Sequence, residues 1–167
     1  LTFDPIASAE AAADMSVSLL LRPERATRLV EYKSRDNSQP GLEYVLDALI
    51  NATWKSKVQP GYYGELRNVG KAVTLKNLMY LIADNEASEQ VRAITYAKLM
   101  ELKSWARKQS SIIKDSNERA SLEFAVFQIE QFESNPTAFK RMEPLSPPDG
   151  SPIGSDIDFE YWHPSTW

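Results

Sequence analysis

Hydrophobic residues recur at helical spacing through most of the chain before residue 136. The clearest stripe follows the spacing i, i+3, i+4, i+7, i+8 and i+11 and consists of Leu42, Val45, Leu46, Leu49, Ile50 and Thr53. This spacing places all of these side chains on one face of an α-helix. A polar turn over residues 36–39 precedes the stripe. The pattern therefore predicts a helix that begins after this turn and ends near Trp54.

Five further helices are predicted from similar periodicity and from their start signals. Prolines occupy positions 5, 23, 40 and 60, and proline suits the first turn of a helix because its missing N–H is not needed there. Asp115 and Glu118 have the spacing of a capping box, in which Asp115 caps the helix and Glu118 reaches back to it. The predicted helices cover residues 5–21, 23–35, 60–82, 91–105 and 115–134.

The last two of these helices are expected to be well buried. Apolar residues between positions 91 and 105 fall on more than one helical face, which predicts a central helix. The final helix has one face through Leu122 and Ile129, and Ala120, Phe124 and Phe127 form a second apolar face. Short turns favour antiparallel neighbours. The predicted fold class is all-α, with about six helices in an antiparallel bundle or in stacked helical hairpins, followed by an extended Pro-rich tail.

The chain changes character after residue 136. Six of its ten prolines lie at or beyond Pro136, and the last nine residues include four aromatic side chains. We predict a helical domain over residues 1–136 and an extended tail over residues 137–167 that packs on the body or on a partner. The residues expected to make these interactions are Pro147, Pro148, Pro152, Ile153, Phe159, Tyr161, Trp162 and Trp167.

Composition and charge exclude several classes of protein. The chain is 43% hydrophobic and 25% charged with a net charge of −4, and it shows no basic stretch, so nucleic acid is not an expected partner. No apolar run approaches the ~20 residues that a membrane span needs. The absence of cysteine excludes thiol catalysis, disulfides and cysteine-based zinc sites. The first residue is Leu1, which suggests a processed or cut segment of a longer protein.

The single histidine, His163, limits the metal chemistry open to the chain. Asp156, Asp158 and Glu160 alternate with other residues, so an extended strand would place them on one side, where they form a weak metal site with His163. A solvent-facing acidic edge is the simpler interpretation. Neither a Gly-x-Ser-x-Gly elbow nor a phosphate-binding loop is present. No catalytic residue is therefore assigned.

Four segments in order along the chain carry a resemblance to a known family. They are LLLRPERATRLVE at residues 19–31, GLEYVLD at 41–47, QVRAI at 90–94 and PPDGSPIG at 147–154. Together they resemble the C-terminal helical region of large bacterial zinc-dependent metalloprotease-like proteins, whose metzincin-type catalytic domain lies upstream. The His-Glu-x-x-His motif of that domain has no counterpart here, so no catalytic residue carries over.

The resemblance implies a non-catalytic accessory or structural domain of a larger, exported protein, periplasmic or secreted. Its partner would be the intramolecular catalytic domain of that protein. Zinc is expected only in that upstream domain, and no cofactor is expected in this chain. Two alternatives remain open: a free-standing HEAT-like helical module that binds proteins, and an enzyme that uses carboxylates and a recruited metal around His163.

Overall fold

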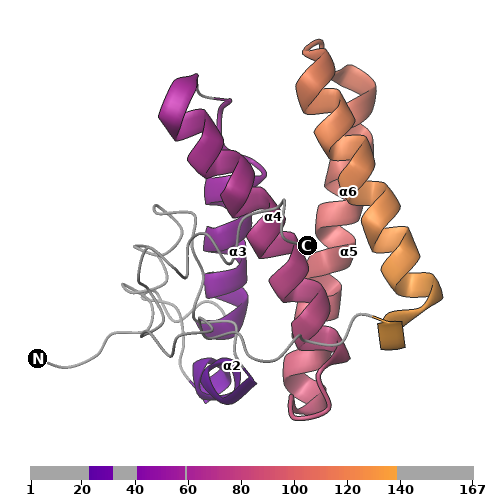
Figure 1. Cartoon of the computed structure of the whole chain (residues 1–167). Coiled ribbons are helices and arrows are strands. Elements are labelled where there is room, and N and C mark those ends of the chain that lie inside the picture. Colours follow the sequence, from indigo (N-terminus) through magenta and orange to yellow (C-terminus); the bar gives the residue numbers. More distant parts are fainter. Residues whose placement is uncertain (1–22, 32–40, 59, 139–167) are drawn as a thin grey trace, which may run out of the picture.

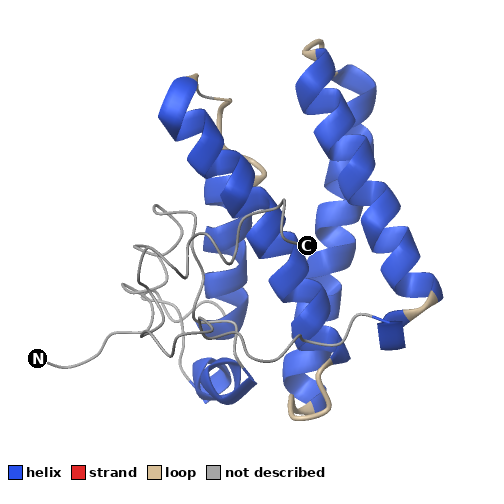
Figure 2. Ribbon diagram, in the orientation of Figure 1, coloured by secondary structure: helices blue, strands red, loops and turns tan. Residues whose placement is uncertain are grey.

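The computed structural model describes residues 23–31, 41–58 and 60–138, and within them every regular element is a helix (Figures 1 and 2). The elements are α2 (Pro23–Glu31), α3 (Gly41–Thr53), α4 (Gly61–Ala83), α5 (Glu89–Ile112), α6 (Ser116–Ser134) and the short 3-10 helix η1 (Pro136–Ala138). The all-α prediction is confirmed. The helix predicted over residues 5–21 and nearly all of the predicted tail lie outside the described residues.

The helices form two antiparallel hairpins, α3 with α4 and α5 with α6, that pack side by side (Figure 1). The shorter α2 packs against α3 and α5. Helix α5 contacts each of the other four α-helices in the described part of the chain, which confirms its predicted central position.

Local signals set where several helices begin. Helix α4 starts at Gly61, whose φ of +63° is a backbone conformation that favours glycine. The Ser88 hydroxyl accepts a hydrogen bond from the Val91 N–H at 3.2 Å, so Ser88 caps α5. At α6 the Asp115 carboxylate accepts from the Glu118 N–H at 2.9 Å, and this half of the predicted capping box is confirmed.

The apolar faces of the helices meet in one core. The stripe on α3 is buried as predicted, with Leu42, Val45 and Leu46 each 0% exposed. Leu99 and Leu102 of α5 belong to the same core. A leucine moved from water into such a core stabilises the fold by roughly 1.5–3 kcal/mol.

Helix α6 packs through one face only. Its buried residues alternate in steps of four and three, as in a coiled-coil seam, and are Glu118, Leu122, Ala125, Ile129 and Phe132. The second face predicted to be buried is instead exposed: Phe124 is 58% and Phe127 55% accessible, and Ala120 is exposed. That prediction was wrong because the seam alone docks α6 on α5, and the opposite face is left uncovered by the described helices.

Candidate functional site

The sequence-predicted candidates in the tail cannot be placed. The weak metal candidates Asp156, Asp158, Glu160 and His163 lie outside the described residues. The same holds for the eight predicted interaction residues between Pro147 and Trp167. The candidate site must therefore be built from the helical body.

Two negative findings apply to the part of the chain that the structure describes. There, no group of three or more histidine, aspartate or glutamate side chains is arranged so that it could hold a metal ion. None of the helices described combines the length and the apolar character that a bilayer crossing requires.

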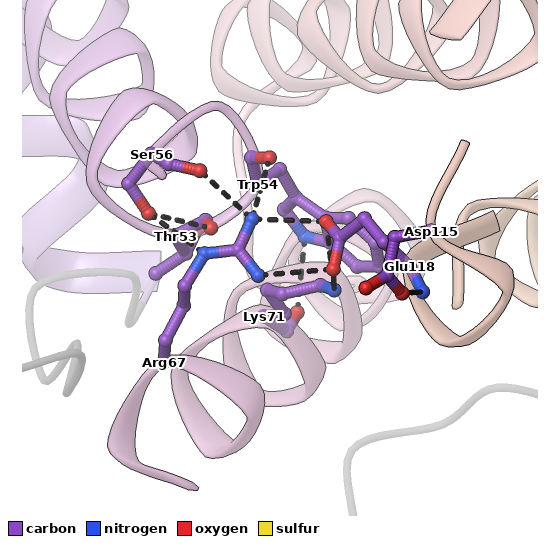
Figure 3. A network of polar contacts seen from close by, with 7 residues as sticks. All are labelled: Thr53, Trp54, Ser56, Arg67, Lys71, Asp115 and Glu118. Atoms are coloured by element: carbon purple, nitrogen blue, oxygen red, sulfur yellow. Dashed lines mark hydrogen bonds and ion pairs between the residues drawn. The ribbon is translucent and has the colours of Figure 1, made fainter. Parts of the chain in front are cut away.

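The most conspicuous polar feature of the body is a buried ion cluster between α4 and α6 (Figure 3). Arg67 and Lys71, one turn apart on α4, are 6% and 2% exposed, and Glu118 in the first turn of α6 is 8% exposed. The sequence predicted that the Glu118 side chain reaches back to the start of its own helix. Its carboxylate instead faces the two cations of α4, so the second half of the predicted capping box is not formed.

Arg67 and Glu118 meet through two parallel hydrogen bonds. The Arg67 Nη2 donates to Glu118 Oε1 at 3.0 Å, and Nη1 donates to Oε2 at 3.2 Å. Lys71 Nζ lies 3.5 Å from each carboxylate oxygen. A two-pronged guanidinium–carboxylate contact is among the stronger and more directional hydrogen-bonded pairs in proteins. It therefore fixes the start of α6 against α4.

Further hydrogen bonds made by Arg67 and Trp54 hold the turn that follows α3. Arg67 Nε donates to Ser56 Oγ at 2.9 Å, and Nη2 also donates to the backbone oxygens of Ser56 at 2.9 Å and Trp54 at 3.3 Å. The Trp54 indole N–H donates to the Lys71 carbonyl at 3.1 Å, and Lys71 Nζ lies 4.8 Å from the Trp54 ring centroid. We name Trp54, Ser56, Arg67, Lys71 and Glu118 the Glu118 cluster. It joins three segments of the chain.

The electrostatics of the cluster keep Glu118 ionised. Burial alone raises the pKa of this carboxyl, but the Arg67 hydrogen bonds and the charges of Lys71 and Arg67 outweigh burial and hold the pKa below its ordinary value of 4.5. Burial, together with the neighbouring Arg67, lowers the pKa of Lys71 despite the opposing pull of Glu118. The two cations thus lower the pKa of the anion that they share, whereas burial is the main cause of the lowered pKa of Lys71. A carboxylate held in this way stays ionised near neutral pH. The Glu118 cluster therefore acts as a clamp that holds the start of α6 against α4.

Acid should remove the stability that this clamp provides. Because the pKa of Glu118 is lower in the folded chain than its ordinary 4.5, the contribution is fully present above that pH and is lost as the pH falls through the folded value. The difference in unfolding free energy between the native chain and Glu118→Gln should therefore be largest near neutral pH and shrink below pH 4.5. Urea titrations at a series of pH values measure it, and a difference that does not vary with pH would contradict the assignment.

A second ion cluster joins α3 to α5. Lys98 is 6% exposed, and its Nζ lies 2.9 Å from Asp47 Oδ1, 3.3 Å from Glu43 Oε1 and 3.3 Å from Glu101 Oε2. Burial lowers the pKa of this ammonium, but the hydrogen bond and charge of Asp47, aided by Glu101, raise it above its usual value overall. The ammonium occupies the position between these three carboxylates. This cluster too connects helices.

A different kind of feature lies on the outer face of α6. The rings of Phe124 and Phe127 stack with centroids 6.4 Å apart and planes inclined by 23°, within the range of favourable aromatic pairs. Both side chains are more than half exposed. We call them the phenylalanine pair. Together they form a small contiguous apolar patch on the outer face of α6.

Comparison with known proteins adds no relative to this picture: no protein-family model, no curated protein and no solved structure matches the chain.

Proposed function

We propose that this chain is a non-catalytic accessory domain that buttresses the catalytic domain of a larger zinc-dependent metalloprotease-like protein. The observation that carries the proposal is that the buried charged side chains form ion pairs between helices. The charged side chains buried in the described helices are Arg67, Lys71, Lys98 and Glu118. Each is engaged in an ion pair that joins two helices.

This use of charge supports a mechanical role. An acid–base residue needs a pKa near the working pH and room for a substrate, whereas the Glu118 carboxylate is held ionised by two cations within 3.5 Å. Buried ion pairs that cross helix boundaries resist sliding of one helix on another, because separating them leaves a charge buried without a partner. Such a body suits a domain that supports a neighbour.

The resemblance supplies the identity of that neighbour. The segments GLEYVLD and QVRAI form parts of α3 and α5, and the described part of LLLRPERATRLVE forms α2, so three of the four stretches that carry the resemblance contribute to the packed core. In the proposed parent protein the zinc ion and the proteolytic residues belong to the upstream domain.

Isothermal titration calorimetry of the full chain against the separately expressed upstream catalytic region tests the proposal. We expect saturable one-to-one binding to both the zinc-loaded and the zinc-free catalytic region, because the contact is structural. An unrelated zinc protease serves as the control and should give no heat of binding. Absence of binding to the proposed partner would contradict the accessory role.

A free-standing interaction module is the second candidate, and the arrangement of two consecutive helical hairpins favours it. A HEAT-like module would present a concave apolar face formed by successive hairpins. The exposed apolar side chains of the described body are instead distributed over several helices, as shown by Tyr62 on α4, Tyr96 on α5 and the phenylalanine pair on α6. We therefore retain the accessory domain as the leading proposal.

A further inference from the structure

The phenylalanine pair has no partner among the described helices. The seam through Leu122 and Ile129 docks α6 on α5, while Phe124 and Phe127 stack on the opposite face with more than half of each side chain accessible. The positions next to them, Ala120 and Gln131, are also exposed. The face is thus an aromatic surface with Ala120 and Gln131 at its two ends and the acidic side chains of Glu123 and Glu130 along one side.

The size of this surface limits what can cover it. A phenylalanine side chain offers roughly 150–250 Å², so the two exposed fractions of 58% and 55% amount to about 200 Å² of aromatic surface. A stable complex between separate proteins needs about 800 Å² from each partner. The phenylalanine pair is therefore too small to hold a second copy of the chain, but it is large enough to seat a few side chains of a segment that is already tethered nearby.

We infer that the phenylalanine pair is the docking site for the aromatic C-terminal segment of this same chain, residues 156–167. The chain leaves α6 through η1, which packs against the end of that helix, and 29 residues follow Ala138. Four of them, Phe159, Tyr161, Trp162 and Trp167, are aromatic and lie within the last nine positions. The inference goes beyond the proposed function and does not need the upstream domain.

The distances suit a tethered ligand. Twenty residues separate Ala138 from Phe159, and a linker of that length spans about 25 Å as a flexible coil and more when it is extended. Phe127 lies about 10 Å along the helix axis from Ser134, at 1.5 Å per residue. The linker is therefore longer than the distance it must bridge, and the tether still keeps the segment at a high effective concentration near the pair. A small contact surface is then sufficient.

The charges near the phenylalanine pair are largely paired among the helices themselves. Residues 103–119, at the α5–α6 turn, contain five cationic and two anionic side chains, but Lys103 and Arg107 are paired with Glu133 and Glu130 of α6, and Glu118 is neutralised in the Glu118 cluster. Residues 139–167 contain five acidic and two basic side chains. On the flank of the phenylalanine pair, Glu130 is paired with Arg107, which reduces its repulsion of an acidic segment.

Paramagnetic relaxation in the full chain tests this inference. Because the sequence lacks cysteine, Gln131→Cys provides a single attachment point for a nitroxide beside the phenylalanine pair, and the indole N–H signals of the four tryptophans report the distances. We expect loss of the Trp162 and Trp167 signals. A label attached through Gln90→Cys, at the far end of α5, is the matched control and should leave both signals intact.

Replacing the pair by serine in the Gln131→Cys background, with Phe124→Ser and Phe127→Ser, should restore the Trp162 and Trp167 signals. The signal of Trp54, whose indole donates to the Lys71 carbonyl near the start of α6 and far from the label, should stay unchanged and so report an intact fold. Persistent loss of the tail signals in this variant, or no loss in the parent label, would overturn the inference. Mixing nitroxide-labelled chain with isotope-labelled chain identifies a second copy, and loss of signal that appears only between copies would also overturn it.

Discussion

Glu118→Gln should lower the free energy of unfolding by about 3 kcal/mol, because breaking one side of a buried ion pair leaves the other side charged and without compensation. In this chain two buried cations, Arg67 and Lys71, lose their shared anion. Glutamine keeps the shape and the backbone N–H that Asp115 caps, so the change isolates the charge. Urea unfolding followed by the helical circular dichroism signal measures the effect.

The matched control is Glu123→Gln, at an exposed position on the same helix, and it should change stability by less than about 0.5 kcal/mol. If both variants lose the same stability, the Glu118 cluster is not a clamp. A triple variant with Arg67→Met, Lys71→Leu and Glu118→Leu should recover much of the loss, since apolar residues can replace a complete buried ion cluster at little cost.

Leu99→Ala should cost about 3 kcal/mol, the second large effect expected from the fold. Leu99 is 0% exposed in α5, the helix that contacts every other described α-helix, so the surroundings cannot easily collapse into the space that the missing atoms leave. Ile112→Ala near the end of the same helix is the control, because Ile112 is 64% exposed. We expect a change of less than about 0.5 kcal/mol there. Similar losses at both positions would show that α5 is not central.

The helices were predictable because their information is local. The α3 stripe predicts its buried face, since a spacing of three and four residues has only one geometric solution on a helix. Proline and glycine at positions 60 and 61 predict the start of α4. The end of α5 was set too early, because the helix continues to Ile112 through residues 107–112, which are exposed or half-buried and carry no apolar stripe.

The Glu118 cluster was not predictable in the same way. Asp115 and Glu118 fit a capping box on their own helix, and nothing local favours a partner that lies 51 residues earlier in the chain. The signal that could have found it is the occurrence of Arg67 and Lys71 one turn apart in a helix whose other positions are largely apolar. Such cations need an anion from another element when the helix is buried on all sides.

The phenylalanine pair shows what the apolar pattern of a helix does not predict. Apolar spacing identifies a face that avoids water, but it does not identify what covers that face. The sequence places Phe124 and Phe127 on a second apolar stripe of α6, and the prediction that this stripe joins the core assumed a neighbouring helix that the described fold does not provide there.

The hairpin order of the helices also bears on how fast the chain can fold. Helices α3, α4, α5 and α6 pack mainly on their neighbours in sequence, so most native contacts close short loops, and helical domains of low contact order reach the folded state in microseconds to milliseconds. The pairing of Arg67 with Glu118 spans 51 residues and must wait until both hairpins have formed. The Glu118 cluster would then act mainly on the rate of unfolding, because its ion pairs form only after the helices have assembled.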